Sequence, residues 1–177
     1  MPVYLATVRS YRSWREGDPD GFVQHDQGLQ PPSPKLASWR DEIANQLPTH
    51  FSCDRFEMLL DVVTEIALEK AVRLHGCCVT STHVHQIISF RQPECICRNV
   101  EHCHRDCRGR QHVELVLTRY KRIAGYRLAK AVGVGGRKWF SHGWNISPVR
   151  TPEHMAYLLE TYLPKHKEEG GVVRIVC

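Results

Sequence analysis

The stretch of sequence that decides the fold is CCVTSTHVHQIISF, residues 77–90. Its second half, residues 84–90, is apolar and β-branched and therefore predicts a strand. The polar triplet at residues 80–82 predicts a turn, so the whole segment is typical of a β-hairpin. His83 and His85 stand two positions apart, and such side chains point to the same face of a strand, about 7 Å apart. Two imidazoles on one face can share a divalent cation.

The bulk composition describes an ordinary globular chain. Its 177 residues predict a single domain, 1–177, and 42% hydrophobic and 24% charged residues are usual for a soluble protein. No apolar run approaches the roughly 20 residues that a membrane-spanning helix needs. The chain starts directly with strand-like residues and shows no signal peptide, so we expect a cytoplasmic protein whose eight cysteines are reduced or bind metal. The net charge of +5 is compatible with a polyanionic partner.

The pattern around the hairpin alternates strands and helices. Asp54, with Glu57 three residues later, resembles a capping box at the start of a helix. Thr151 and Pro152 are typical of the first residues of another helix. Strands are expected at 4–9, 138–140 and 172–176, helices at 39–47, 54–73, 111–132 and from 152 onward, and a long loop at 11–34. This order favours an α+β fold with a central antiparallel sheet and helices on one face over a doubly wound parallel sheet.

Four segments, in this order, resemble the single-tyrosine HUH transposases, the group of insertion-sequence-200-like and REP-associated tyrosine transposases. They are residues 4–18, the hairpin segment 82–88, residues 139–143 and the helical segment 152–163. Together they span most of the chain. The resemblance implies a ferredoxin-like or RRM-like palm, a Mg²⁺ or Mn²⁺ cofactor and, in many members, a homodimer. It also implies a transposase activity in which single-stranded DNA is cut at hairpin-flanked ends through a 5′-phosphotyrosine and then joined again.

The nucleophile of such a reaction is a tyrosine, and the resemblance assigns this role to Tyr162, with Tyr157 as the alternative. A free phenol has a pKa near 10 and needs activation. Tyr162 also shares a helical face with Met155, Leu158 and Leu159. On the residues alone, a core aromatic is therefore the favoured explanation.

His83 and His85 are the expected metal ligands, because a divalent cation neutralises the anionic phosphodiester and polarises its phosphorus. Imidazole suits Mn²⁺ better than Mg²⁺, which prefers oxygen ligands, so a third ligand would help. The resemblance points to His166, four residues after Tyr162 and on the same helical face. Pro164 stands between them, however, and proline inside a helix removes a hydrogen bond and kinks or ends it. The alternatives are strand histidines with ordinary hydrogen bonds and an exposed His166.

A cysteine-rich insertion at about 93–110 is the unusual part of the chain. Cys95, Cys97, Cys103 and Cys107 lie within 13 residues, close enough to hold a structural Zn²⁺, and His102 or His104 could replace one thiolate. The spacing is not that of a standard zinc finger. The alternative is a polar loop with reduced cysteines.

The densest basic stretch falls on the second long helix and is a candidate DNA-binding face: Arg119, Lys121, Arg122, Arg127 and Lys130. The alternative is a solvated helix surface. For the whole protein, the alternative to a strand-transfer enzyme is an RRM-like nucleic-acid-binding module whose catalytic site has decayed. A covalent protein–DNA adduct distinguishes the two.

Overall fold

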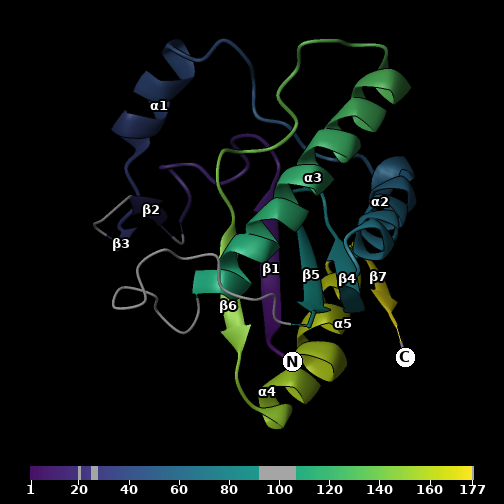
Figure 1. The fold of residues 1–177 in the computed structure, drawn as a ribbon. Helices are drawn as coiled ribbons and strands as arrows, with labels where there is room; N and C mark the ends of the chain where they lie inside the picture. Colours follow the sequence, from purple (N-terminus) through teal and green to yellow (C-terminus); the bar gives the residue numbers. More distant parts are fainter. Residues whose placement is uncertain (20, 25–27, 92–106, 177) are drawn as a thin grey trace.

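A five-stranded antiparallel sheet forms the centre of the protein (Figure 1). The computed structural model describes residues 1–19, 21–24, 28–91 and 107–176. The strands lie side by side in the order β6-β1-β5-β4-β7. Their bounds are β1 Val3–Arg9, β4 Arg73–Val79, β5 His83–Ser89, β6 Asn145–Val149 and β7 Val172–Ile175. The hairpin predicted from residues 77–90 is the β4–β5 pair.

Two long helices complete a ferredoxin-like unit on one face of the sheet. α2 (Phe56–Glu69) lies between β1 and β4 in the chain, and α3 (Cys107–Val132) between β5 and β6. The order β-α-β-β-α-β, with β1 and β5 in the middle of the sheet, is the ferredoxin-like arrangement. β7 extends the sheet beyond β4. The predicted α+β fold is therefore confirmed.

The packing between these helices and the sheet forms the main hydrophobic core. Apolar residues recur along α2 at helical spacing, and those that face the sheet are buried: Phe56, Leu59, Leu60, Val63, Ile66 and Ala67. Every second residue of β1 meets them, namely Tyr4, Ala6 and Val8. Burying one such leucine contributes about 1.5–3 kcal/mol. This face is the main source of stability.

The C-terminal segment covers the opposite face of the sheet. It consists of α4 (Pro152–Tyr157), a π-helical turn (Leu158–Tyr162) and α5 (Leu163–Glu168). A smaller cluster forms there, in which Leu158 and Leu163 pack against Cys78 and Ile87. Gly76 allows this approach, since a Cβ at that position would lie 2.9 Å from Leu163 Cδ1. The sheet thus carries the predicted helical layer and a second, shorter one behind it.

The region before α2 differs from the sequence prediction. The expected loop at 11–34 contains a small antiparallel pair, β2 (Phe22–Gln24) and β3 (Gly28–Gln30). The helix expected at 39–47 is α1, Pro34–Glu42, because proline suits the first turn of a helix, where its missing N–H is not needed.

Two local predictions fail for identifiable reasons. Asp54 does not cap α2, because a 3₁₀ turn at Cys53–Arg55 precedes the helix and the Asp54 carboxylate pairs with Arg55 at 3.2 Å. Residues 138–140 form only a single bridge, between Phe140 and Ser10, and the strand follows at β6. The predicted cap at Thr151 is confirmed by its side chain, which accepts a hydrogen bond from the His154 N–H at 3.1 Å.

Candidate functional site

The two hairpin histidines project from the start of β5 onto the face that the C-terminal segment covers. A tight turn sets their position, in which the Thr80 N–H donates to the His83 carbonyl at 2.9 Å. The side chain of Thr80 also accepts hydrogen bonds from the backbone N–H groups of Thr82 and His83. The two imidazole centroids lie 4.6 Å apart. The predicted juxtaposition of His83 and His85 is present.

The π-helical turn brings Tyr162 and His166 to the same place. Pro164 has no N–H and makes no α-helical bond to the carbonyl four residues earlier. The chain widens before it, so the Leu163 N–H bonds to the carbonyl of Leu158, and then continues as α5. Such single π turns are frequent at functional sites. The chain therefore stays helical through Pro164.

Three imidazoles and one phenol therefore form a single aromatic cluster. The His166 ring lies 5.1 Å from that of His83 and 4.9 Å from that of His85, between centroids. The Tyr162 ring lies 5.2 Å from His85 and 5.0 Å from His166. Residues from β5 and from the C-terminal helices, distant in sequence, thus meet against one face of the sheet.

Each histidine of this cluster has its Nδ1 atom held by an oxygen. His85 Nδ1 lies 2.7 Å from Thr7 Oγ1, and His83 Nδ1 lies 2.9 Å from Thr82 Oγ1. His166 Nδ1 donates to the Glu169 carboxylate at 2.9 Å. The Nε2 atoms of His83 and His166 are buried and have no hydrogen-bond partner among the described residues. Metal-binding histidines characteristically hold one ring nitrogen in this way and leave the other for the cation.

Burial keeps the hairpin imidazoles neutral at physiological pH. It lowers the pKa of His83 to about 4 and that of His85 to about 2, with further lowering from the neighbouring histidines and from Arg9. A neutral imidazole carries the free lone pair that a cation requires. The acid-base state of both rings therefore suits metal binding.

Tyr162 and Tyr157 occupy different environments. The Tyr162 hydroxyl lies 3.1 Å from His85 Nε2, to which it can donate a hydrogen bond. Burial raises the pKa of the Tyr162 phenol, Cys78 adds to this, and Arg9 opposes it. Tyr157 is 52% exposed, and its ring centroid is 6.4 Å from that of Tyr162. Of the two tyrosines, Tyr162 is the one whose hydroxyl reaches the histidines.

Two further residues, which the sequence did not predict as part of the site, border the histidine cluster. Cys78 pairs with His85 across the hairpin and is fully buried. Its sulfur and one ring nitrogen each of His85 and His166 all lie within 4.8 Å of one another. The tight turn at 80–82 is the signal that could have revealed this pairing, because it fixes the register.

Arg9 is the second of these residues. It is the cross-strand partner of His83 on β1, and its guanidinium lies 4.2 Å from the ring centroid of Trp14. Burial lowers the Arg9 pKa, whereas Tyr162 and Asp18 raise it. It brings a positive charge to the edge of the histidine cluster.

The predicted basic residues of α3 lie on the other side of the sheet, and three of them make internal contacts. Arg119 pairs with Glu69 at 3.0 Å and Arg127 with Glu65 at 2.5 Å, which ties α3 to α2. The ammonium group of Lys121 donates to the carbonyls of Ser141 and Gly143, and burial lowers its pKa to about 8. Arg122 and Lys130 are exposed and form no ion pair within the described ranges.

The predicted zinc ligands fall largely outside the described part of the chain. Cys95, Cys97 and Cys103 are not described, and for Cys107 only its place at the start of α3 is. In the part of the chain that the structure describes, no helix is both long and apolar enough to cross a bilayer.

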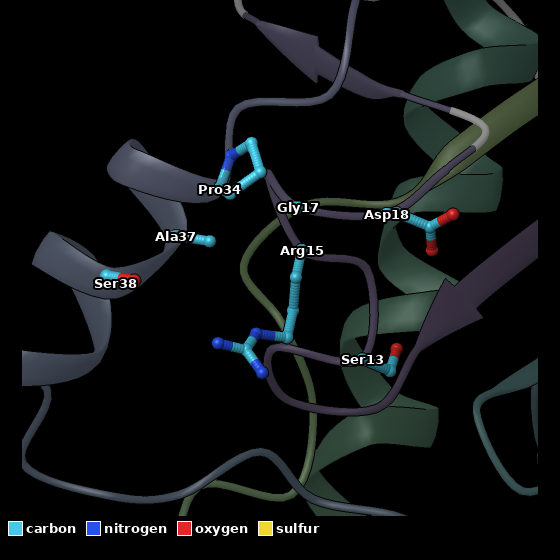
Figure 2. Close-up of a pocket in the computed structure, with 7 residues that line it drawn as sticks. All are labelled: Ser13, Arg15, Gly17, Asp18, Pro34, Ala37 and Ser38. Carbon is cyan, nitrogen blue, oxygen red and sulfur yellow. The ribbon is translucent and has the colours of Figure 1, made fainter.

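Two surface pockets flank the segment that follows β1. One, of about 360 Å³, lies between residues 13–18 and α1, where Gly17 lies beside Pro34 and Ala37 and the Arg15 side chain extends away from both (Figure 2). The other, of about 560 Å³, is lined by basic and aromatic residues that include Tyr11, Arg12, Trp14, Arg40, Lys138 and His142. Neither contains a member of the histidine cluster, but Trp14 connects the larger one to Arg9.

The comparisons with known proteins include a weak structural similarity. No protein-family model and no curated protein sequence matches the chain. Among solved structures, a REP-associated tyrosine transposase bound to a REP hairpin aligns over 94% of this chain and 68% of its own, with a TM-score of 0.40 and 11% sequence identity. A similarity of this size does not by itself support a statement about activity.

Proposed function

We propose that this protein is a metal-dependent, single-stranded DNA endonuclease and strand transferase that acts through a 5′-phosphotyrosine intermediate, as in HUH transposases. One observation carries the proposal. Three histidines, each with its Nδ1 held by an oxygen, surround a phenol that hydrogen-bonds to one of them. Two of the remaining Nε2 atoms are buried without a partner among the described residues, which is costly unless a ligand satisfies them.

The donor set fits a divalent cation. His83, His85 and His166 would hold Mn²⁺ or Mg²⁺ through their Nε2 atoms, with Thr7, Thr82 and Glu169 orienting the rings. The bound cation would neutralise charge on the scissile phosphate and polarise its phosphorus. Three protein ligands leave coordination positions for phosphate oxygens and water.

Tyr162 is the proposed nucleophile. Its oxygen forms a bond to the 5′-phosphorus, the bond from phosphorus to the 3′-oxygen breaks, and that oxygen takes up a proton while the phenolic proton passes to solvent. The tyrosyl ester keeps the phosphodiester energy, so the reverse reaction rejoins a strand without ATP. The Tyr162 hydroxyl can donate a hydrogen bond to His85 Nε2, and a cation that used this lone pair would leave Tyr162 free to turn to the phosphate.

Arg9 and the larger surface pocket are proposed to position the DNA. The Arg9 guanidinium lies beside the cluster, where it can bind a phosphate oxygen. Trp14 lies under Arg9 and also lines the pocket with Tyr11, where bases can stack. Arg122 and Lys130 on α3 are proposed as weaker, more distant phosphate contacts. The homodimer remains a prediction from the resemblance; the proximity of Tyr162 to His85 supports an active site within one chain.

The test is covalent adduct formation. Reduced protein is incubated with a pool of labelled single-stranded DNA hairpins and Mn²⁺, and the products are separated on a denaturing gel. We expect a protein–DNA adduct from the wild type and from Tyr157→Phe, and none from Tyr162→Phe. An adduct that survives in Tyr162→Phe would assign the nucleophile to another residue. DNA binding without any adduct would instead favour the RRM-like binding module.

A further inference from the structure

The described part of the cluster contains a second set of metal donors that includes a thiol. Cys78 lies on β4 directly opposite His85, and both side chains point to the face that α5 covers. Its sulfur and one nitrogen each of His85 and His166 lie within 4.8 Å of one another. All three side chains are buried, with exposed fractions of 0%, 6% and 7%.

His166 supplies independent evidence that this space is arranged for a ligand. Its Nδ1 donates to the Glu169 carboxylate, which fixes the tautomer and leaves a lone pair on Nε2. The His166 side chain is more than nine-tenths buried, and its Nε2 atom has no hydrogen-bond partner among the described residues. Thr7 holds the Nδ1 atom of His85 in the same manner.

We propose that Cys78, His85 and His166 form a three-ligand site for a thiophilic divalent cation such as Zn²⁺. The inference rests on the metal-binding role proposed for the two histidines but is independent of DNA cleavage. A thiolate selects Zn²⁺ or Co²⁺ over Mg²⁺ and Mn²⁺, which favour oxygen ligands. Three protein ligands with a fourth position open to water are typical of reactive zinc sites.

The geometry requires only a small contraction. Zn–N bonds of about 2.0–2.1 Å and a Zn–S bond of about 2.3 Å place tetrahedral donors about 3.5 Å apart. The present separations of up to 4.8 Å therefore close by up to about 1.3 Å, within the reach of side-chain rotation. On binding, the Cys78 S–H bond breaks, the proton passes to solvent, and a Zn–S bond forms.

One consequence is competition between cations. His85 and His166 belong both to this site and to the histidine set proposed for Mn²⁺. The Zn²⁺ set contains Cys78 as its third ligand, whereas the Mn²⁺ set contains His83. Zn²⁺ should therefore displace Mn²⁺, and the metal present decides which set is used.

The test measures cobalt binding by absorption, with Co²⁺ as the spectroscopic substitute for Zn²⁺. A background variant with Cys95, Cys97, Cys103 and Cys107 changed to serine removes the other candidate thiolate site. In this background we expect a thiolate-to-cobalt charge-transfer band that saturates at one Co²⁺ per chain and disappears on addition of Zn²⁺. Cys78→Ala should abolish the band and weaken Zn²⁺ binding by at least about 100-fold, more than the loss of an orienting residue.

Cys77→Ala is the matched control, since Cys77 is the adjacent, equally buried cysteine on the other face of β4. It should keep the band. Circular dichroism establishes that each variant folds, and His166→Gln, which leaves Cys78 in place, should also lose the band. A band that survives in folded Cys78→Ala, or no band in the background protein, overturns the proposal.

These outcomes are separable from those of the proposed function. Mn²⁺-dependent adduct formation with no cobalt–thiolate band removes the Cys78 site and leaves the nuclease intact. A cobalt–thiolate band without any adduct does the reverse.

Discussion

The two faces of the sheet are built in opposite ways. On the face covered by α2 and α3, the inward residues of β1 are Tyr4, Ala6 and Val8, and they meet a continuous apolar surface. On the face covered by the C-terminal segment, Thr7 alternates with them and lies against His85. One strand thus contributes an apolar core to one side and, on the other side, Val3 and Leu5 together with the polar Thr7 of the buried histidine cluster.

This difference separates stability from chemistry. Close-packed apolar side chains stabilise the fold in proportion to the area that they bury. Unpaired imidazole nitrogens do the opposite, because a buried acceptor without a partner costs about 1–3 kcal/mol. The larger apolar core therefore supplies most of the stability, and the smaller cluster around Leu158 and Leu163 holds the C-terminal segment on the sheet. Mutations on the two faces should differ in their effects on the free energy of unfolding.

The largest stability effect is expected on the apolar face. Leu60→Ala removes a fully buried side chain between α2 and the sheet and should lower the free energy of unfolding by about 2–5 kcal/mol. Leu68→Ala, on the same helix but 78% exposed, is the control and should change it by less than about 0.5 kcal/mol. Urea denaturation of the chelator-treated proteins measures both. Equal effects of the two substitutions would contradict the description of this core.

Acid should destabilise the protein through the polar face. The pKa values of His83 and His85 in the folded protein, about 4 and about 2, lie below the unfolded value of 6.5. Between these limits the unfolded chain binds more protons, so the stability present above pH 6.5 is lost as the pH falls. The expected loss for the metal-free protein is about 4 kcal/mol by pH 5, from two sites at up to about 1.4 kcal/mol per pH unit each over about 1.5 pH units.

A double variant, His83→Gln with His85→Gln, provides the comparison for the acid series. Its free energy of unfolding should depend much less on pH between 6.5 and 5, whereas Leu68→Ala should retain the wild-type slope. If the double variant keeps that slope, the carboxylates and not these histidines cause the acid sensitivity.

The two faces also differ in how far the sequence predicts them. Regular spacing identified α2, and the period-two alternation placed His83 and His85 on one face, because both are properties of a few consecutive residues. Thr7 could not be assigned to His85 in this way, since the two are 78 residues apart and meet only through the β1–β5 register. Arg9 became a neighbour of His83 through the same pairing.

The C-terminal helix shows why a local rule can mislead. Pro164 predicts a kink or an end, whereas the structure widens one turn and continues, so the i, i+4 relation of Tyr162 and His166 survives in modified form. The packing of Leu158 and Leu163 against the sheet favours this solution. Tertiary contacts of this kind are not present in the sequence pattern of the helix.

A smaller effect is expected when the π turn is removed. Pro164→Ala restores an N–H that can bond in the ordinary α-helical way, and the register of Tyr162 relative to His166 should then shift by one residue, about 100° around the helix. Adduct formation should fall about tenfold or more, while stability stays equal or rises, since proline in a helix interior is unfavourable. Lys165→Ala, at the next position and exposed, should leave both unchanged. Unaltered adduct formation in Pro164→Ala would mean that the π turn does not position the nucleophile.

The smallest effects are expected on α3, where free and paired cations can be compared on one helix. Arg122→Gln with Lys130→Gln should weaken binding of single-stranded DNA a few-fold and reduce the salt dependence by one to two released counterions, about 0.7 in slope for each. Arg127→Gln should leave binding unchanged, because its guanidinium is engaged by Glu65, and should lower stability by about 0.5 kcal/mol.

Arg9→Gln, beside the histidine cluster, should weaken binding of single-stranded DNA more than the double α3 variant does and should also reduce adduct formation. Titrations at several salt concentrations distinguish these cases. If the double α3 variant binds like the wild type, the DNA contacts only the histidine side of the sheet, and the basic residues of α3 serve the fold.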